Sequence, residues 1–388
     1  PYTVFGKDID PEAIQQMENA VSLPVAVKGA LMPDAHMGYG LPIGGVLAVK
    51  DAVIPYAVGV DIACRMKLSV FSLTFNEFQE HKDSFRAALE TCTKFGVGAE
   101  YSRPKAHPVM DEDWNISPLV LSLKDKAHKQ LGTSGSGNHF AEFGKLTLNR
   151  DDLGLKAGEY LSLLTHSGSR GPGAKIADHY SKLAKLMHPE LGKPLNNLAW
   201  LELKKEEGME YIKAMELMGR YAAANHEIIH NTILAFLNES ALATVENHHN
   251  FAWKEKIGLR EVMVHRKGAT PAAKGVYGII PGSMADPGYI VRGLGKQESI
   301  QSASHGAGRL LSRKAAMKQF TYKDLQELMQ KKGVSLISGG IDEIPMAYKN
   351  IETVMNQQKD LVETIAKFEP VLVKMAAADR KSSRKKKS

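Results

Sequence analysis

Five glycine-rich segments divide this chain, and they constrain its fold more than any other feature. They read PDAHMGYGLPIGG (33–45), GTSGSGNHF (132–140), THSGSRGPG (165–173), IPGSMADPG (280–288) and SASHGAGR (302–309). Each couples small residues to a histidine, arginine, aspartate or serine, and four of the five contain histidine. Glycine lets backbone N–H groups approach a ligand closely and form concavities that bind anions. We therefore expect these loops to build one large site for a polyanion.

The segments between the loops predict short strands mixed with helices. Apolar runs bounded by turn residues indicate strands at 44–50, 66–73, 160–166 and 261–267. Helical periodicity is clearest at 204–238, where one face carries Met215, Met218, Ala222, Ile229 and Ile233. A second helix is expected at 347–366. Because strands and helices do not alternate regularly, we expect an α+β fold with mixed sheets.

The composition is typical of a globular protein with a sizeable core, with 43% hydrophobic and 24% charged residues. No stretch approaches the ~18 consecutive apolar residues that a membrane-spanning helix needs. The first residues do not have the pattern of a signal peptide. The only two cysteines, Cys64 and Cys92, argue against a disulfide framework and for a reducing cytosol. We therefore expect a cytoplasmic protein without a membrane partner.

The net charge of +7 is concentrated at one end of the chain. The last ten residues, DRKSSRKKKS, hold six Lys/Arg and one Asp, which is a net +5 and leaves +2 for the rest. We expect residues 377–388 to be a disordered basic tail. Such a tail adds non-specific affinity for phosphates, or is simply a solvated end. The tail alone does not indicate a function.

Several side chains suggest a metal site. The candidate histidines lie in or beside glycine-rich or strand-end segments: His36, His139, His166, His249, His265 and His305. Asp61 and Cys64 occur in VGVDIACRM and can face one centre if the backbone turns between them. Thiolate, imidazole and carboxylate together suit a borderline divalent ion such as Mn²⁺, Zn²⁺ or Fe²⁺, and one thiolate could bridge two ions. The alternative is a buried cysteine beside a helix cap.

A different pattern points to another class of enzyme. His226, Glu227 and His230 read HEIIH, the H-E-x-x-H pattern of zinc proteases, with Glu246 or His249 as a third ligand. The same residues fall near the apolar stripe of the helix at 204–238, so a packed helix face explains them equally. The protease hypothesis also leaves all five glycine-rich loops unexplained.

Eight motifs in this chain resemble those of the RtcB RNA-ligase family. They are VGVDIACRM, GSGNHFAEF, HSGSRG, HHNFA, HRKGATPA, PGSMADPGYIV, SHGAGR and DEIPMAYKNI, and they occur in family order between about residues 28 and 360. The resemblance implies a single large α+β catalytic domain over 1–376, with mixed sheets around a deep, metal-lined cleft that holds two ions. One Mn²⁺ would be held by Asp61, Cys64 and His139, and the other by Cys64, His166 and His249.

The resemblance also implies a nucleotide site and a reaction. The histidine that carries GMP in the family maps to His305. The guanylate-binding stretches map to Asn138, His139, Phe140, Ala141, Glu142, His249, Asn250, Pro281, Gly282, Ser283, Met284, His305, Gly306, Ala307 and Gly308. Family members use GTP and two Mn²⁺ ions to join a 2′,3′-cyclic phosphate or 3′-phosphate RNA end to a 5′-hydroxyl end, in tRNA splicing or RNA repair. We expect the protein to be a monomer. The phosphates of the bound RNA are expected to contact Arg170, Arg266, Lys267 and Arg309, although each of these side chains could be a solvated surface charge.

Three positions depart from the family pattern. Gly288 stands where a serine usually helps to hold the nucleotide. Lys374 is displaced by one position from the lysine of a usual C-terminal Lys-Gly pair, and Met375 takes its place. Asn225-His226 replaces a frequent Asn-Arg. These changes favour weaker use of GTP, and leave open a divergent RNA-end cyclic phosphodiesterase or specialised repair enzyme, or a non-catalytic RNA-end binder.

Overall fold

Two large sheets organise the fold, and most of their strand pairs are antiparallel. The computed structural model describes residues 1–377 of the 388, so the basic tail expected at 377–388 lies, apart from its first residue, outside the described residues. The five-stranded sheet has the order β1 (Tyr2–Val4), β2 (Ala26–Tyr39), β3 (Leu41–Val49), β11 (Arg260–Lys267) and β10 (Asn250–Ile257). Only its β1–β2 pair is parallel within the described chain.

The larger sheet brings the last described strand into the middle of the molecule. Its order is β13 (Tyr277–Ile280), β14 (Gly288–Gly293), β17 (Val362–Met375), β6 (Phe140–Leu148), β7 (Gly158–Ser167), β5 (Arg65–Phe71) and β9 (Ala241–His248), with β16 (Ser335–Ser338) paired in parallel to β17. The sheet curls until its end strands meet, since the Ile279 N–H donates to the Asn247 side chain at 2.9 Å. Two short pairs complete the strands: β4 (Ala52–Val53) with β8 (Leu201–Glu202), and β12 (Ala269–Pro271) with β15 (Ser302–Ser304).

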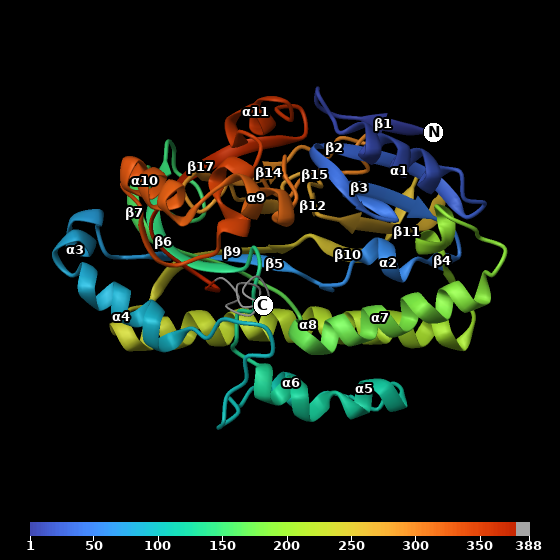
Figure 1. The fold of residues 1–388 in the computed structure, drawn as a ribbon, viewed down its shortest axis with the longest axis horizontal. Helices are drawn as coiled ribbons and strands as arrows, with labels where there is room; N and C mark the ends of the chain where they lie inside the picture. Colours follow the sequence, from blue (N-terminus) through green and yellow to red (C-terminus); the bar gives the residue numbers. More distant parts are fainter. Residues whose placement is uncertain (378–388) are drawn as a thin grey trace, which may run out of the picture.

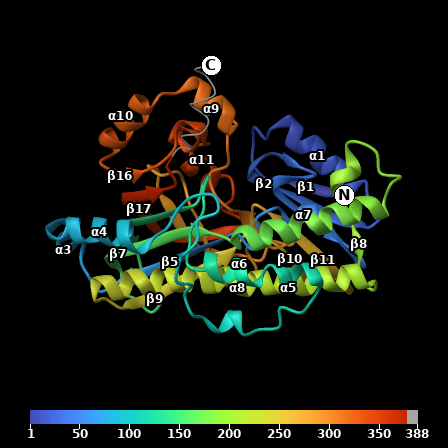
Figure 2. The same ribbon diagram turned by 60° about the horizontal axis from the view of Figure 1, so that its bottom comes forward.

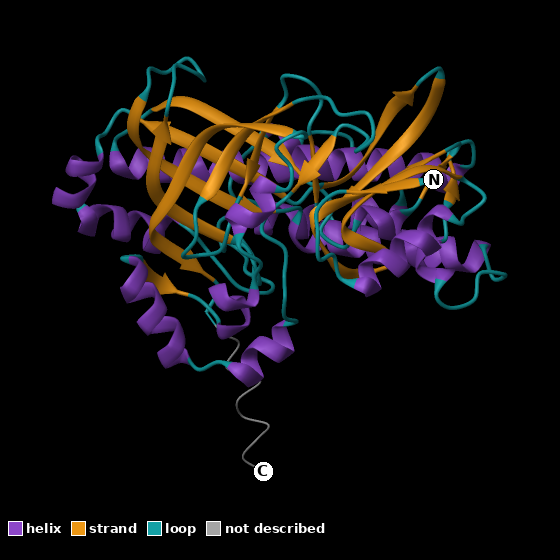
Figure 3. Ribbon diagram, turned by 90° about the horizontal axis from the view of Figure 1, so that it is seen from above, coloured by secondary structure: helices purple, strands orange, loops and turns teal. Residues whose placement is uncertain are grey.

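The longest helices, α7 (Arg170–Met187) and α8 (Glu206–Leu237), lie side by side beneath both large sheets (Figures 1 and 3). The remaining helices are α1 (Pro11–Val21), α2 (Pro55–Val58), α3 (Phe75–Glu80), α4 (Lys82–Cys92), α5 (Pro118–Ser122), α6 (Lys124–Gln130), α9 (Arg313–Gln319), α10 (Tyr322–Lys332) and α11 (Ile351–Asn356). Figure 2 shows α9, α10 and α11 on one side of the molecule, and α1 with β1 and β2 on the other. No helix in this described part of the chain combines the length and apolarity needed to cross a membrane.

The strand predictions are confirmed, and the two helix predictions have opposite outcomes. Strands β3, β5, β7 and β11 cover the four apolar runs. The helix predicted at 204–238 is α8, which buries Met215, Met218 and Ile229 and ends at Asn238, a residue in the left-handed conformation that asparagine tolerates (φ 56°). The helix predicted at 347–366 is wrong.

The error at 347–366 has a physical cause in the strand that follows. Only Ile351–Asn356 is helical there, and β17 already begins at Val362. Residues of β17 alternate between buried and partly exposed positions over much of the strand. Pairing with β14 on one side and β6 on the other satisfies the backbone of β17, so tertiary context overrides the local helical pattern.

Candidate active site

A cavity of about 680 Å³ has walls from both large sheets. Chain segments far apart in the sequence meet there, from the β2–β3 hairpin to the loop before α9. All the candidate histidines except His265 line it, together with the two other candidate ligands: His36, Asp61, Cys64, His139, His166, His249 and His305. The structure therefore brings together the side chains that the sequence singled out.

The first group of potential ligands is Asp61, Cys64 and His139, whose ligand atoms all lie within 4.8 Å of one another. The His139 Nε2 is 3.0 Å from an Asp61 carboxylate oxygen and 3.5 Å from the Cys64 Sγ. A turn aims Asp61 and Cys64 at one point: the Cys64 N–H donates to the Asp61 carbonyl (3.2 Å), and Ala63 between them has a positive φ of 56°. The backbone turn that the sequence left open is therefore present.

Cys64, His166 and His249 form the second group, so a single sulfur belongs to both groups. The Cys64 Sγ is 3.1 Å from the His166 Nε2, which is 3.3 Å from the His249 Nε2. His166 lies near the end of β7, and His249 lies in the corner between β9 and β10. The Cys64 carbonyl accepts from the His249 N–H at 3.0 Å, which fixes the two ligands relative to each other.

The hydrogen bonds behind these rings fit a metal centre. His139 Nδ1 lies 2.6 Å from the Ser134 carbonyl, and His166 Nδ1 lies 3.0 Å from the Asn138 carbonyl. A carbonyl only accepts, so each Nδ1 carries the proton and each Nε2 turns a lone pair toward Cys64. Burial, with a smaller effect of charge on His139, lowers the pKa of His166 to about 3. Burial also lowers the pKa of His249 well below its ordinary value.

The same pocket disfavours a thiolate unless a cation is bound. Burial and the neighbouring Asp61 carboxylate raise the pKa of the Cys64 thiol well above its ordinary value. Neutral imidazoles, a carboxylate and a sulfur that converge without a cationic side chain among them suit a borderline divalent ion, which would deprotonate the thiol. The residues therefore fit one or two such ions.

His305 stands beside this group and is held by a buried carboxylate. Its Nδ1 lies 2.7 Å from an Asp34 carboxylate oxygen, and that oxygen also accepts from the backbone N–H groups of His305 (3.1 Å) and Gly306 (3.3 Å). Asp34 has no exposed surface. Burial alone raises the pKa of Asp34, but the hydrogen bonds that Asp34 accepts from the side chain and the backbone of His305 outweigh it and hold the pKa below its ordinary value. The His305 ring centre is 5.1 Å from that of His249.

Glycine is needed where the backbone packs against this pair. At Gly308 (φ +76°), a Cβ would lie 2.1 Å from the Asp34 carbonyl oxygen. At Gly268 (φ +59°), a Cβ would lie 3.1 Å from the His305 ring and 2.5 Å from an Ile43 methyl. Only glycine allows these approaches without moving the imidazole. Two of the glycines therefore have a steric role in the site.

Most of the residues assigned to guanylate line the same cavity. They are Asn138, His139, Phe140, His249, Asn250, Pro281, Gly282, Ser283, Met284, His305, Gly306, Ala307 and Gly308. Ala141 and Glu142 lie further along β6, outside the lining. Glu142 is buried, and burial raises the pKa of its carboxyl well above the ordinary value.

The four proposed phosphate contacts have different surroundings. Arg309 and Lys267 line the cavity. The Arg309 guanidinium bonds Glu343 (2.7 Å) and lies 4.9 Å from the Tyr348 ring centre. The Nε–H of Arg170 donates to Thr133 at 3.1 Å, outside the lining.

The surroundings of Arg266 favour a structural role over the expected phosphate contact. The side chain is 1% exposed and forms an ion pair with Glu255 (2.6 Å). It also donates to the Ser302 hydroxyl (2.8 Å) and the Ile300 carbonyl (3.0 Å). The motif HRKGATPA gave no sign that the Arg266 side chain joins β11 to β10 through its ion pair with Glu255.

Replacing Arg266 by alanine is expected to destabilise the protein without changing its salt-dependent affinity for RNA. Removing one partner of a largely buried ion pair typically costs about 3–5 kcal/mol, because the other partner is left uncompensated. Urea unfolding should therefore show a lower midpoint for Arg266→Ala. An unchanged midpoint together with a weaker salt dependence of RNA binding would restore Arg266 as a phosphate contact.

The zinc-protease pattern does not form a metal site. The His226 Nδ1 and the His230 Nε2 both contact the Thr165 hydroxyl, at 2.7 and 2.8 Å. Glu227 lies on the exposed side of α8 and pairs with His107 at 3.4 Å. The two histidines thus attach α8 to β7, and the packed-face interpretation holds. His265 is also structural, since it bonds the Ile54 N–H (2.9 Å) and lies 3.2 Å from the Leu47 carbonyl.

The altered C-terminal end leaves a methionine at the cavity. Met375 lines it, whereas the Lys374 ammonium donates to the carbonyls of Leu89, Glu90 and Thr93 at the end of α4. Lys374 is therefore not available to a nucleotide. Gly288, at the start of β14, is not among the lining residues.

Two functional candidates were not predicted from the sequence. Asp34, the partner of His305, lies in the glycine-rich PDAHMG segment, and that position was the available signal. Arg313 lines the cavity with a half-exposed guanidinium that bonds Glu343 at 2.7 Å. No motif distinguished Arg313 from other surface arginines.

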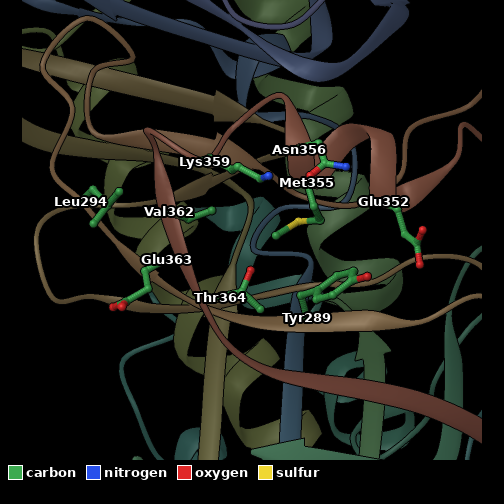
Figure 4. A pocket seen from close by; sticks show the side chains of 9 residues that line it. All are labelled: Tyr289, Leu294, Glu352, Met355, Asn356, Lys359, Val362, Glu363 and Thr364. Atoms are coloured by element: carbon green, nitrogen blue, oxygen red, sulfur yellow. The ribbon is translucent and has the colours of Figure 1, made fainter. Parts of the chain in front are cut away.

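A second cavity of about 600 Å³ lies apart from this site, between β14, α11 and β17. Figure 4 shows the side chains that line it, among them Tyr289, Met355 and Val362. Its lining contains no histidine or cysteine and shares no residue with the first cavity. The potential metal ligands are therefore confined to the first cavity of the two.

Comparison with known proteins agrees with the geometry. A family model described as tRNA-splicing ligase RtcB matches residues 16–116 and 114–376. "RNA-splicing ligase RtcB" of Escherichia coli K12 is 36% identical to this chain over 93% of each protein. "tRNA-splicing ligase RtcB" of Methanococcus maripaludis is 31% identical, over 94% of this chain and 92% of that protein. "RNA-splicing ligase RtcB homolog 2" of Entamoeba dispar is 28% identical, over 93% and 83%. Both the family match and the two closer similarities span nearly the whole described chain, and on these grounds the chain belongs to the RtcB family of tRNA-splicing ligases.

Proposed function

We propose that this protein is an RNA ligase that uses GTP and Mn²⁺ to join a 2′,3′-cyclic phosphate or 3′-phosphate end to a 5′-hydroxyl end. The observation that carries the proposal is the juxtaposition of His305, held by buried Asp34, with two ligand groups that share Cys64. The names of the similar ligases support the RNA substrate. We further propose that it acts as a monomer in the cytoplasm, consistent with its two free cysteines.

In this proposal His305 is the nucleophile. Because its Nδ1–H donates to Asp34, the Nε2 lone pair is free to attack the α-phosphate of GTP. The Nε2–phosphorus bond forms while the bond to pyrophosphate breaks. Water first opens a 2′,3′-cyclic end to a 3′-phosphate by breaking its P–O2′ bond. An oxygen of the RNA 3′-phosphate then attacks the phosphorus of the His305-bound GMP, and the bond to the imidazole Nε2 breaks as the GMP moves to the RNA. Attack by the 5′-hydroxyl of the second RNA end finally expels GMP and forms the phosphodiester.

Asp61, Cys64 and His139 would hold one Mn²⁺, and Cys64, His166 and His249 the other. Bound ions would neutralise charge on the phosphates and activate the oxygens that react. The glycine-rich backbone at 281–284 and 305–308 lines the side of the cavity where the guanylate is expected. Its N–H groups would fix the nucleotide without adding charge, since such transfers depend mainly on positioning and electrostatics.

A second candidate function follows from the C-terminal change. Lys374 bonds carbonyls of α4 and Met375 faces the cavity, so the guanylate would lack a cationic partner there. This favours an enzyme that opens RNA cyclic phosphates or repairs special ends with weakened use of GTP. A non-catalytic RNA-end binder is the remaining alternative.

One experiment separates the three candidates. The protein is incubated with Mn²⁺, α-labelled GTP and RNA that carries a 2′,3′-cyclic phosphate and a 5′-hydroxyl. A ligase forms an acid-labile, alkali-stable protein–GMP adduct and a circular or joined RNA. A phosphodiesterase opens the cyclic phosphate without the adduct, and a binder does neither. Failure to form adduct and joined RNA would reject the ligase proposal.

Replacing Asp34 by asparagine is expected to slow guanylylation about 10²-fold, the typical cost of misplacing a reacting group. The variant keeps the size of the side chain but loses the charge that orients His305. Since Asp34 is fully buried and does not line the cavity, the KM for GTP should change little while the rate constant falls. A raised KM with an unchanged rate constant would contradict this positioning role.

A further inference from the structure

An exposed aromatic ring lies at the rim of the cavity. Tyr39, at the end of β2, is 70% exposed and lines the cavity. Met37 and Val60, also large and apolar, are 50% and 51% exposed and line the same rim. An apolar group of this kind beside a polar cavity marks a surface for a ligand rather than an ordinary solvated face.

Hydrogen bonds fix the backbone at and around Tyr39. The Lys267 ammonium, on a side chain buried at the end of β11, donates to the Tyr39 carbonyl (2.5 Å) and to the Tyr56 carbonyl (3.2 Å). Gln16 forms two hydrogen bonds with the backbone of Gly38, at 2.7 and 3.0 Å. At Gly40 (φ +73°), a Cβ would lie 2.9 Å from the Asn197 carbonyl oxygen. The hairpin therefore holds an exposed ring in place before any ligand arrives.

The surroundings of the ring are aromatic and partly cationic. The Tyr39 and Tyr56 rings meet edge to face, with centres 6.5 Å apart and planes at 77°. The ammonium groups of Lys185 and Lys267 lie 5.5 and 5.0 Å from the centre of the Tyr56 ring. Three acids lie nearby. Asp10 caps α1 and accepts from the Met37 N–H, Glu12 lines the cavity, and Asp178 pairs with Lys182 at 2.8 Å. Aromatic rings beside cations are the combination that binds single-stranded nucleic acid.

The position also matches the path of an RNA end. Two of the expected guanylate stretches, 281–284 and 305–308, come from the C-terminal part of the chain, whereas Tyr39 belongs to the N-terminal hairpin. Lys267 joins the two, because the next residue, Gly268, packs against His305 and its N–H donates to Asn250 (2.7 Å). An RNA strand that reaches His305 from this rim would pass the exposed ring.

We propose that Tyr39 is a stacking platform for an unpaired base of single-stranded RNA next to the reacting end, a role that rests on the proposed ligase function. Stacking tolerates any base because every base has a π face. The platform would therefore position the strand without selecting its sequence. Tyr56 supports the ring through the edge-to-face contact.

The test compares Tyr39→Ala, Tyr39→Phe and a matched control, Tyr322→Ala, in the full chain with Mn²⁺. Tyr322 is also exposed but lies on α10, outside the cavity lining. The probes are short single-stranded RNAs ending in a 5′-hydroxyl or in a 3′-phosphate, each with 2-aminopurine beside that end. Tyr39→Ala should weaken binding of one of them roughly 5- to 100-fold and abolish the fluorescence quenching that stacking causes. Tyr39→Phe and Tyr322→Ala should behave like the unaltered protein.

A matched RNA with abasic positions beside the end isolates the stacking. The unaltered protein should bind it more weakly, and Tyr39→Ala should bring no further loss. The proposal is overturned if Tyr39→Ala binds intact RNA as tightly as the unaltered protein does. It is also overturned if Tyr39→Ala weakens binding of abasic RNA as much as it weakens binding of intact RNA, or if the unaltered protein does not bind RNA. Guanylylation is measured separately in each variant: its absence from the unaltered protein rejects the ligase function, whereas an unaltered Tyr39→Ala affinity rejects only the platform.

Discussion

Replacing His305 by alanine abolishes the covalent protein–GMP adduct and all joining of RNA ends, if this imidazole is the nucleophile. We expect the loss of adduct to be complete. Among the described residues that line the cavity, no other histidine has its Nδ1 bonded to a buried carboxylate and its Nε2 free. The measurement is the retention of label from α-labelled GTP on the denatured protein, followed by gel analysis of the RNA. Acid should release the label and alkali should not, as for a phosphoramidate.

The matched control for this variant is His179→Ala, at an exposed histidine on α7. It should form adduct at the normal rate. Metal content should remain unchanged in His305→Ala, since His305 belongs to neither ligand group. Retained labelling in His305→Ala would move the covalent step to another residue, and peptide mapping would identify it.

The second large effect is expected from Cys64→Ser. Cys64 belongs to both ligand groups, so its replacement weakens two metal sites at once. Removing a residue that only hydrogen-bonds a metal ligand typically lowers metal affinity about 10- to 100-fold. Removing a ligand that two ions share should lower the affinity further. We expect the manganese bound per chain, measured by elemental analysis after dialysis, to fall from about two ions to nearly none. Guanylylation and ligation should disappear with it.

Cys92→Ser is the control, because Cys92 is the only other cysteine and is buried among Phe78, Phe85 and Phe143, away from the cavity. It should keep the full metal content, even if it unfolds more easily. If Cys64→Ser binds manganese as the unaltered protein does, then the sulfur does not bridge. In that case Asp61 with His139, and His166 with His249, would have to act as independent sites.

The sequence predicted the site better than it predicted the secondary structure around it. The ligand groups at positions 61 to 249 assemble as expected, because the motifs specify both the side chains and the turns that aim them. The α+β fold and the helix at 204–238 are also confirmed. The helix at 347–366 fails, since strand pairing across the sheet is a long-range interaction that local periodicity does not contain.

Individual polar residues were harder to interpret. Arg266 and His265 are buried hydrogen-bonding residues, although they stand beside a functional motif. Asp34 was not singled out, although its carboxylate holds His305. The sequence separation of 271 residues between Asp34 and His305 explains the omission. A partner of this kind becomes visible only when the fold places the two segments together.

The central position of β17 has a consequence for synthesis of the protein. This strand is made after every other described element, yet it lies between β14 and β6. While the ribosome is still translating, β6 and β14 therefore lack the neighbour that joins them, and the wall behind Phe140 and Pro281 is unfinished. A nascent chain that has not yet made β17 therefore has both groups of potential metal ligands but an incomplete wall on the side where the guanylate is expected.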